Sequence, residues 1–414
     1  MAASFPTLKT ALYQDSFVPL AGVKAARIES IDLLRGAVMI LMVLDHVREF
    51  FHETAFTYDP LDLQHTSVAL FFTRWITHFC APVFVFLAGV SAYLYGARRS
   101  TRELSHFLFT RGLWLVFVEM AVITLERTFN IHYDFISLQV IWVIGISMIL
   151  LSAVVYLNMR VILVSGLLVI AGHNLLDDIH IPGHGACAFL WSLLHEPGYF
   201  SFGSLSFRVI YPVLPWVGVM ATGYAFGHLF TAAYDVDRRK KFLLQAGTGM
   251  IGLFLLLRFF NLYGQAAPWV SQADATFSVL SFMTVTKYPP SLLYLLITLG
   301  PAFVFLSIAE RPLNGWSARV SVYGRVPMFY YLIHLPLIHF LAVIAAVSTG
   351  FPASSMILKS TRINEVPALN GFGFDLLVVY VVWAAVVLML YPACKWYDTY
   401  KSRYGSRKWW LSYI

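Results

Sequence analysis

The chain has 414 residues, of which 59% are hydrophobic and only 12% are charged. Soluble domains are roughly 45–50% apolar and about 25% charged, so this composition excludes an ordinary soluble protein and indicates an integral membrane protein. The net charge of +7 includes no basic patch interleaved with aromatic residues, so no nucleic-acid partner is expected. Three cysteines without metal-site spacing predict neither a disulfide framework nor a bound metal.

Apolar runs recur along the whole chain, and a helix of about 20 apolar residues is long enough to cross a bilayer. The sequence therefore predicts an all-α integral membrane protein, a polytopic bundle of about ten transmembrane helices. The predicted spans are residues 31–51, 67–97, 108–128, 135–157, 161–176, 209–234, 243–263, 288–309, 326–348 and 373–396. No linker interrupts them, so we expect one transmembrane domain over 31–396, between an N-terminal segment 1–30 and a basic tail 397–414.

The distribution of Lys and Arg predicts the orientation, because these residues are retained in cytoplasmic loops. With both termini in the cytoplasm, the cytoplasmic segments hold 20 Lys and Arg residues and the opposite segments hold six. Residues 1–30 contain no apolar run with a cleavage site, so the first span is expected to act as its own insertion signal.

The first span carries one stripe of residues at alternating spacings of three and four. The stripe consists of Asp32, Arg35, Met39, Met42 and His46, which lie on one helix face. Arg35 is close to the predicted cytoplasmic end, and His46 lies about 16 Å further along at the helical rise. Charges within a span are costly and tend to face a bundle interior, a water-filled path or a partner.

Two interpretations of this stripe remain open. In the first interpretation, Asp32 caps the helix and pairs with Arg35 at the membrane interface. In the second, the residues of the stripe take part in the function of the protein. His46 lies well inside the span beside Asp45, and imidazole suits proton transfer because its ordinary pKa is near 6.5.

The second and ninth spans also carry polar residues. Arg74 and His78 share a helix face, with Trp75 adjacent, and are suited to bind an anion, to orient another imidazole or to pair structurally. Tyr330 and His334 are one turn apart, and at least one of His334 and His339 is expected to face the interior.

Two long loops on the predicted non-cytoplasmic side, 177–208 and 264–290, are rich in Gly, Pro, His and aromatic residues. Either they roof a cavity that is open to that side, or they pack at the membrane interface.

Five motifs in order carry a resemblance to a known family. They are "SIDLLRGAVMILMVLDHVREFF", "FFTRWITHFCAPVFVFLAGVSAYL", "YPVLPWVGVMATGYAFG", "TKYPPSLLYLLITLGPA" and "YGRVPMFYYLIHLPLIH". Together they resemble bacterial membrane proteins grouped with the catalytic domain of heparan-alpha-glucosaminide N-acetyltransferase. The resemblance implies a multi-pass protein of the bacterial inner membrane that transfers an acyl group, expected to be acetyl, from cytoplasmic acyl-CoA. The implied acceptor is a sugar or glycan amine or hydroxyl on the far side.

The resemblance also implies roles for individual residues. The family's D-x-x-R-G motif matches Asp32, Arg35 and Gly36, and its polar active-site position at the end of the first helix falls on His46. The lysosomal enzyme of this family has a proposed catalytic histidine in the loop before the second helix, and His65 is its nearest counterpart here. The spacing from this histidine to the following P-x-F-V-F-x-x-G motif differs by about three residues. His78 stands where the lysosomal enzyme has Asp, so His46, His65 and His78 all remain candidate bases.

The predicted mechanism is direct transfer, with His46 as general base and with Asp45 or a neighbouring helix fixing its tautomer. No serine elbow or Cys/His arrangement supports a conventional acyl-enzyme, while an acyl-histidine stays open. The cytoplasmic mouth, where the phosphates of CoA are expected, comprises Arg35, Arg325 and Asp32. The acceptor side comprises Arg74, Trp75, His78, Lys287, Tyr288, Tyr330 and His334.

A second class of function fits the same buried polar groups. A proton-coupled transporter, or a flippase of a lipid-linked or sugar-containing substrate, also needs a polar path and broken helices. Such proteins commonly contain internal repeats, and the sequence shows no convincing one. A scaffold whose polar groups only pack helices is a third alternative. Lipid is a certain partner, and a homodimer is left open because lipid-facing and partner-facing surfaces have similar composition.

Overall fold

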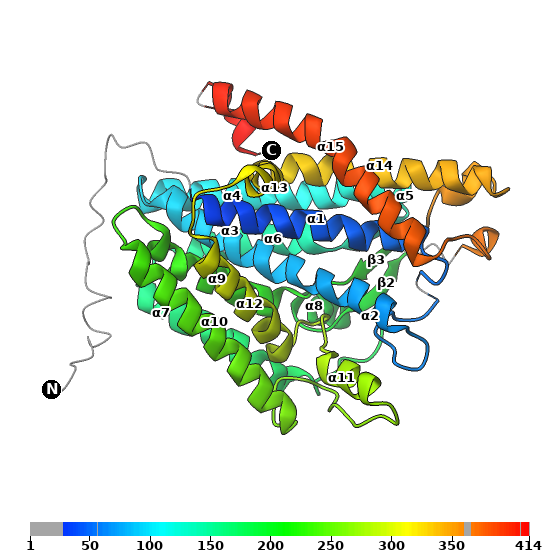
Figure 1. The fold of residues 1–414 in the computed structure, drawn as a ribbon, viewed down its shortest axis with the longest axis horizontal. Coiled ribbons are helices and arrows are strands. Elements are labelled where there is room, and N and C mark those ends of the chain that lie inside the picture. Colours follow the sequence, from blue (N-terminus) through cyan, green and yellow to red (C-terminus); the bar gives the residue numbers. More distant parts are fainter. Residues whose placement is uncertain (1–27, 56, 360–365, 406, 414) are drawn as a thin grey trace.

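The computed structural model describes residues 28–55, 57–359, 366–405 and 407–413, and it is mostly helical (Figure 1). The α-helices are α1 Glu29–Phe51, α2 Val68–Trp75, α3 Cys80–Gly96, α4 Thr101–Phe117, α5 Thr124–Thr128, α6 Val140–Val154, α7 Met159–Gly172, α8 Ala186–Leu194, α9 Val213–Phe226, α10 Val236–Phe259, α11 Ala275–Met283, α12 Leu292–Ala309, α13 Gly315–Arg325, α14 Pro327–Ser348 and α15 Leu376–Tyr404. The strands are β1 Phe135–Leu138, β2 Gly198–Phe202 and β3 Leu205–Val209. Short 3-10 segments are η1 Ile76–Phe79, η3 His173–Leu176, η4 Gly227–Phe230, η5 Ala353–Met356, η7 Pro367–Leu369 and η8 Trp409–Ser412, and η2 Val118–Ile123 is a π-helix.

The predicted polytopic helical membrane protein is confirmed. Eight helical segments of the described chain are long and apolar enough to cross a membrane: Val68–Gly96, Thr101–Thr128, Met159–Leu176, Val213–Phe230, Val236–Phe259, Leu292–Ala309, Pro327–Ser348 and Leu376–Tyr404. The other two predicted spans also coincide with helices. These are α1, which has 23 residues but carries several charges, and α6, which is apolar but has only 15 residues. The cytoplasmic location of both termini stays a prediction, and most of the predicted segment 1–30 lies outside the described residues.

Several predicted boundaries differ from the structure. The span predicted at 135–157 begins with strand β1, because these residues pair in parallel with β3 before α6 starts. The run 67–97 is divided into α2, η1 and α3, with Pro82 in the first turn of α3. Helix α15 continues past the predicted end of the tenth span at residue 396 as far as Tyr404. The division into a transmembrane domain and a basic tail stays a prediction.

Helix α1 lies in the middle of the bundle, with α15 along one edge and α7 and α10 along the opposite edge (Figure 1). It packs most extensively on α13, and it also contacts α3, α12, α14 and α15. Two glycines permit the crossing of α1 and α13. A Cβ atom at Gly36 would overlap the carbonyl oxygen of Val320, and one at Gly324 would overlap that of Asp32. The two backbones therefore touch directly, as small residues allow in membrane helices.

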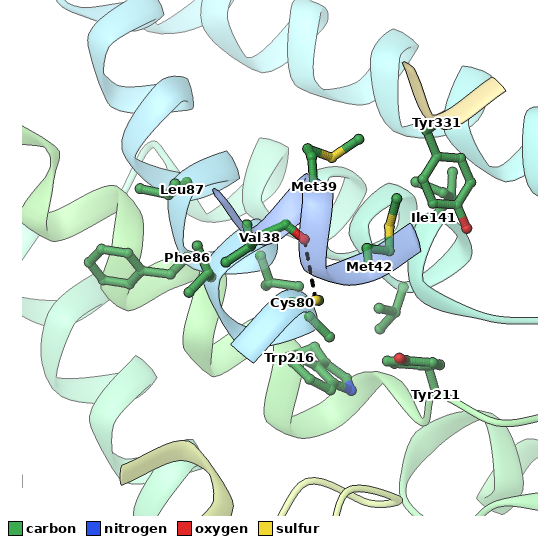
Figure 2. Packing of buried hydrophobic residues seen from close by; sticks show 14 of the residues in the cluster. Val38, Met39, Met42, Cys80, Phe86, Leu87, Ile141, Tyr211, Trp216 and Tyr331 are labelled. Carbon is green, nitrogen blue, oxygen red and sulfur yellow. Dashed lines mark hydrogen bonds between the residues drawn. The ribbon is translucent and has the colours of Figure 1, made fainter. Parts of the chain in front are cut away.

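The middle of α1 belongs to the hydrophobic core. Met39 and Met42 have exposed fractions of 2% and 5%. Figure 2 shows them with Val38 near Cys80 of α3 and Trp216 of α9. Within the predicted stripe, the stretch between Arg35 and His46 is thus filled by packed thioether side chains.

A small sheet with strand order β1-β3-β2 and the helices α8 and α11 lie toward the end of the bundle where α1 ends (Figure 1). Strands β2 and β3 pair antiparallel and come from the loop 177–208, which also contains α8. Helix α11 belongs to the loop 264–290. Both long loops are therefore ordered structures at the end where the outer half of α1 presents its polar residues.

Candidate functional site

The centre of the candidate site is a pair of histidines from two helices. His46 Nδ1 of α1 lies 2.7 Å from His334 Nε2 of α14, with the two rings nearly parallel. His334 Nδ1 lies 3.1 Å from the carbonyl oxygen of Tyr330, one turn earlier on the same helix. Both residues are in regular helix, so the backbones of α1 and α14 fix where the rings meet.

This geometry determines the tautomers of two neutral rings. A carbonyl oxygen only accepts, so His334 Nδ1 carries the proton and donates to Tyr330. His334 Nε2 then accepts, and His46 Nδ1 must be the donor between the two rings. The lone pair of His46 therefore resides on Nε2, and the hydrogen bond to His334 is the one found for the His46 ring among the described residues. An imidazole nitrogen held in this state is suited to accept a proton.

Aromatic residues of α14 surround the histidine pair. The Tyr331 ring packs edge-on against both His46 and His334, at centroid distances of 6.4 and 5.3 Å. The Tyr330 ring stacks on His334 at 5.6 Å. Its buried hydroxyl has no hydrogen-bond partner in the part of the chain that the structure describes.

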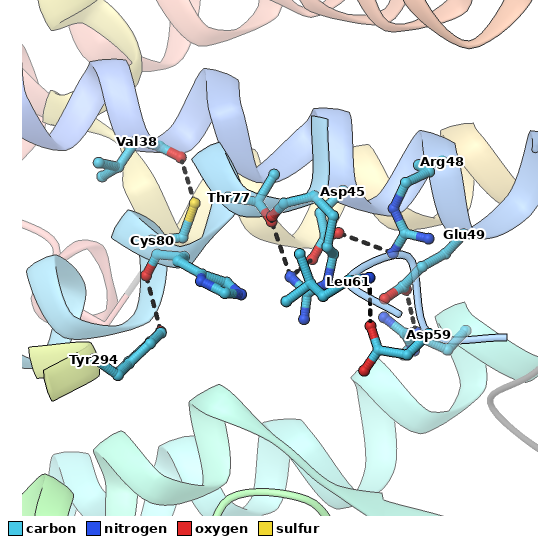
Figure 3. A network of polar contacts seen from close by, with 12 residues as sticks. Val38, Asp45, Arg48, Glu49, Asp59, Leu61, Thr77, Cys80 and Tyr294 are labelled. Atoms are coloured by element: carbon cyan, nitrogen blue, oxygen red, sulfur yellow. Dashed lines mark hydrogen bonds and ion pairs between the residues drawn. The ribbon is translucent and has the colours of Figure 1, made fainter. Parts of the chain in front are cut away.

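Asp45, the neighbour of His46, faces a different set of groups (Figure 3). Its Oδ1 accepts from Arg48 Nη2 at 3.0 Å, and its Oδ2 lies 3.3 Å from Arg74 Nη1. Arg74 also donates to the hydroxyl of Thr77 at 2.9 Å. Asp45 therefore joins two arginines, and the hydrogen bond that orients His46 comes from α14 instead.

The charged residues near His46 are predominantly cationic. Glu49 pairs with Arg127 at 2.7 Å, and the charges that act most strongly on His46 are those of Arg127, Asp45, Lys287 and Arg48. Three of these four groups are positive. Negative charge that develops on a bound molecule would be stabilised here.

Two predicted residues lie beside this cluster with unsatisfied polar groups. His78 is fully buried, and neither of its ring nitrogens has a hydrogen-bond partner within the described chain. Lys287 is 8% exposed, and its side chain forms no ion pair or hydrogen bond with any described residue, although its ammonium lies 5.2 Å from the Tyr288 ring. Buried polar groups are normally paired, so a ligand or water is expected to satisfy these.

Trp75 and Tyr288 are held by other contacts. The indole N–H of Trp75 donates to the carbonyl oxygen of Met283 at 2.9 Å, and its ring packs 6.4 Å from that of His78. The Tyr288 ring packs against Tyr211 at 5.1 Å. Both contacts attach the loop 264–290 to the bundle beside the cationic cluster.

His65 lies apart from the histidine pair. It is exposed in the loop after α1, where it pairs with Asp62 at 2.8 Å and stacks on Tyr58. Two hydrogen bonds hold the pKa of Asp62 below its usual range: the larger effect comes from the backbone N–H of Gln64 and the smaller from the His65 side chain. No contact places His65 beside His46 in the described structure.

The arginines predicted to bind the phosphates of CoA at the cytoplasmic end, Arg35 and Arg325, already form hydrogen bonds and ion pairs within the protein. Arg35 donates to the carbonyl oxygen of Gly324 at 3.1 Å and to Ser91 Oγ at 3.2 Å, and it lies 3.6 Å from Asp32. Arg325 pairs with Asp398 at 2.8 Å. The Arg35 side chain is 18% exposed, and that of Arg325 is 21% exposed, so each retains some surface for a further anion.

Sequence reasoning missed Glu119 and Arg127. Glu119 is 1% exposed in the π-helix η2, and its carboxylate accepts from the backbone N–H of Trp142 at 3.0 Å. Glu119 and Arg127 line the same small void, together with Ser137 and Gln139. A single carboxylate within the apolar run "WLVFVEMAVI" was the available signal, since charges in spans are usually functional. π-Helical segments often occur at functional sites as well.

The fold and the site together define a multi-pass helical membrane protein with a histidine pair in a cationic surrounding, in which His334 is buried and His46 is partly buried. The family model of the catalytic domain of heparan-alpha-glucosaminide N-acetyltransferase matches residues 27–259, and the chain belongs to this family. The matched region includes α1, the Asp45 cluster and His78, while His334 lies outside it. Membership supports a membrane acetyltransferase-like activity with acetyl-CoA as donor. A comparison with curated proteins yields no match.

Proposed function

We propose that this protein transfers an acetyl group from cytoplasmic acetyl-CoA to an amine or hydroxyl of a sugar or glycan on the other side of the membrane, with His46 as general base. The hydrogen bond between His46 Nδ1 and His334 Nε2 carries the proposal. It directs the lone pair of His46 to Nε2, and no hydrogen bond from that nitrogen to a described residue is found.

His46 Nε2 takes the proton of the acceptor group as the acceptor oxygen or nitrogen attacks the thioester carbonyl carbon. The new bond forms to that carbon, and the C–S bond then breaks. The proton passes from His46 to the departing sulfur, which yields free CoA and the acetylated acceptor. His334 supports His46 throughout by accepting a hydrogen bond from its Nδ1–H, an arrangement that resembles the orienting partners of other catalytic histidines.

The surrounding cations support the same step. Negative charge forms on the carbonyl oxygen in the tetrahedral intermediate, and fixed positive groups in a site shielded from water stabilise it. Arg127, Lys287 and Arg48 are the cations that act on His46. Asp45 offsets part of their charge and positions Arg48 and Arg74.

Donor binding is assigned to the cytoplasmic end of α1. Arg35, with Arg325 as a second cation, would meet the phosphates of CoA, since guanidinium binds phosphate through paired hydrogen bonds. Met39 and Met42 fill the core between Arg35 and His46, so the pantetheine arm requires these side chains to move. Methionine is unbranched and flexible, which makes such a rearrangement feasible.

Acceptor binding is assigned to the opposite side of His46. The unsatisfied nitrogens of His78 and the ammonium of Lys287 offer hydrogen bonds to hydroxyl or amine groups of a sugar. Arg74 and Tyr288 complete this side, with Trp75 and Tyr330 as aromatic walls. In this proposal His78 binds acceptor and does not act as the base. We place the protein in a bacterial inner membrane on the resemblance of its motifs.

The test uses the full chain in proteoliposomes, with labelled acetyl-CoA outside and a panel of amino sugars and glycans on the opposite side. His46→Ala should lower the transfer rate by about 10²–10⁴-fold, the usual contribution of a general base. His65→Ala is the matched control and should retain the wild-type rate, because His65 is exposed and apart from the pair. Wild-type transfer by His46→Ala, or loss of transfer in His65→Ala alone, would overturn the assignment.

A further inference from the structure

A second group of polar residues lies in the outer loops, away from the histidine pair. His173 begins η3 at the end of α7, Asp177 follows that segment, and His195 caps the C-terminus of α8. One ligand atom from each residue lies within 4.8 Å of those from the other two. No metal was predicted from the sequence, where a long loop separates the two histidines.

The geometry of two members already resembles that of metal ligands. His195 Nε2 lies 3.1 Å from Asp177 Oδ1, and the rings of His173 and His195 are 5.7 Å apart. Ligand bonds of about 2.0–2.1 Å to a tetrahedral ion place two ligand atoms about 3.3 Å apart. His195 and Asp177 are thus close to the required spacing, whereas the His173 ligand atom, which is within 4.8 Å of the other two, would have to move closer.

The burial of unsatisfied nitrogens points independently to a ligand. His173 and His195 are each 2% exposed. Neither ring nitrogen of His173 meets hydrogen-bond geometry with a described residue, and the Nδ1 of His195 is also unsatisfied. An ion pair between His195 and Asp177 explains two of the three residues but leaves both ring nitrogens of the buried His173 without a hydrogen bond of normal geometry, which is costly.

Neighbouring groups form hydrogen bonds with Asp177, as residues around metal sites commonly do with the metal ligands that they orient. Asn174 donates to Asp177 Oδ2 at 2.9 Å, which leaves Oδ1 directed toward His195. The side-chain oxygen of Asn174 accepts from the backbone N–H of Leu292, the first residue of α12. The carbonyl of Pro290 also interacts with the His173 ring, although outside strict hydrogen-bond geometry. Second partners of this kind orient ligands and are a regular part of metal sites.

We propose that His173, Asp177 and His195 bind one divalent transition-metal ion, with Zn²⁺ as the best match to two imidazoles and one carboxylate. Three protein ligands leave a fourth position for water or another donor. The ion joins α7, the end of α8 and, through Asn174, the start of α12. It therefore fixes the loop 177–208 against the segment that contains Lys287 and Tyr288. This site is independent of the proposed acetyl transfer.

The experiment measures Zn²⁺ binding by full-length protein that carries no histidine tag, purified in detergent and stripped with a chelator. Wild type should bind about one Zn²⁺ per chain, and His173→Ala and His195→Ala should each weaken binding by at least about 100-fold. Asn174→Ala should weaken it by about 10-fold, as loss of an outer partner does. His180→Ala is the matched control, because His180 is an exposed histidine of the same loop.

A second readout is independent of affinity. Zn²⁺ should raise the apparent melting temperature of wild type and His180→Ala by about 3 °C or more, because a ligand that binds only the folded state stabilises it. His173→Ala should lose this shift even if the variant folds as well as wild type. Binding by wild type that equals binding by a His173→Ala, His195→Ala double variant would overturn the proposal. So would a melting shift that persists in the double variant.

Discussion

The two halves of α1 carry similar polar residues and use them differently. In the first half, Asp32 and Arg35 contact each other and Arg35 also binds the backbone of α13, while Gly36 permits the close crossing. In the second half, His46 retains a free nitrogen, and the unsatisfied His78 and Lys287 lie near the same cluster.

The difference shows that a recognisable motif and a reactive group need not coincide. The D-x-x-R-G motif is explained largely by the packing of α1 on α13. The incompletely satisfied polar groups, which mark a place for a ligand, lie in the half without that motif. Four predictions test this division, from the largest expected effect to the smallest.

The first prediction concerns the crossing itself. Gly36→Leu should eliminate the folded protein, because its Cβ would overlap the Val320 carbonyl and a backbone atom cannot yield cheaply. Size-exclusion chromatography in detergent should show loss of the monodisperse peak. Gly249→Leu on α10 is the control, since a Cβ there meets no neighbouring atom and the peak should be unchanged. A normal peak for Gly36→Leu would remove the packing explanation of the motif.

The second prediction concerns the orientation of His46. His334→Ala removes the acceptor for His46 Nδ1 and should lower kcat for acetyl transfer by about 100-fold, within the range of general-base effects. KM should change little, because the substrate contacts remain. Tyr330→Phe provides the matched control. It keeps the backbone carbonyl that anchors His334 and removes only an unsatisfied hydroxyl, so kcat should remain near wild type. Equal kcat values in the two variants would contradict the proposed role of His334 in orienting His46.

The third prediction separates stability from chemistry in the outer half. Asp45→Asn leaves Arg48 and Arg74 without their shared carboxylate, and breaking a buried ion pair commonly costs about 3–5 kcal/mol. The melting temperature should fall by several degrees, with a smaller loss of kcat per folded molecule than in His334→Ala. Asp32→Asn should lower the melting temperature less, because its ion pair is longer, at 3.6 Å. A loss of kcat as large as that in His334→Ala would give Asp45 a direct part in catalysis.

The smallest effect is expected at the cytoplasmic end. Arg35→Lys should raise KM for acetyl-CoA by about 3- to 10-fold with little change in kcat, because lysine lacks the planar fork that binds phosphate. Arg102→Lys on the exposed start of α4 is the control and should leave KM unchanged. An unaltered KM in both variants would contradict a role of Arg35 in binding acetyl-CoA and would leave only its contacts with α13 and Ser91.

The helical architecture was readable from the sequence because lipid imposes long apolar runs, and a helix lies at every predicted span. The helix breaks were less visible. Strand β1 depends on pairing with β3, which is distant in the sequence, and the π-helix η2 leaves no distinctive local pattern.

Most polar residues that the candidate site brings together could be recognised in the sequence, with Glu119 and Arg127 as exceptions, but their pairings could not. His46, Asp45, Arg74 and His334 were recognisable as charges or imidazoles in apolar spans. Their partners depend on how helices rotate against one another, so the sequence left open whether Asp45 or another helix orients His46. The Glu49 and Arg127 pair joins helices far apart in the chain, and no spacing rule applies to such a contact.

The packing of α1 also has a consequence for biosynthesis. This helix is synthesised well before its partners Gly324 and His334, which follow 289 and 288 residues after Arg35 and His46. At typical synthesis rates of 5–20 residues per second, α1 waits roughly 15 to 60 s for them. The two ion pairs that it can form alone, Asp32 with Arg35 and Asp45 with Arg48, are both three residues apart. These two ion pairs can form as soon as α1 is helical. They therefore pair most of the charged side chains of α1 before α13 and α14 have been synthesised.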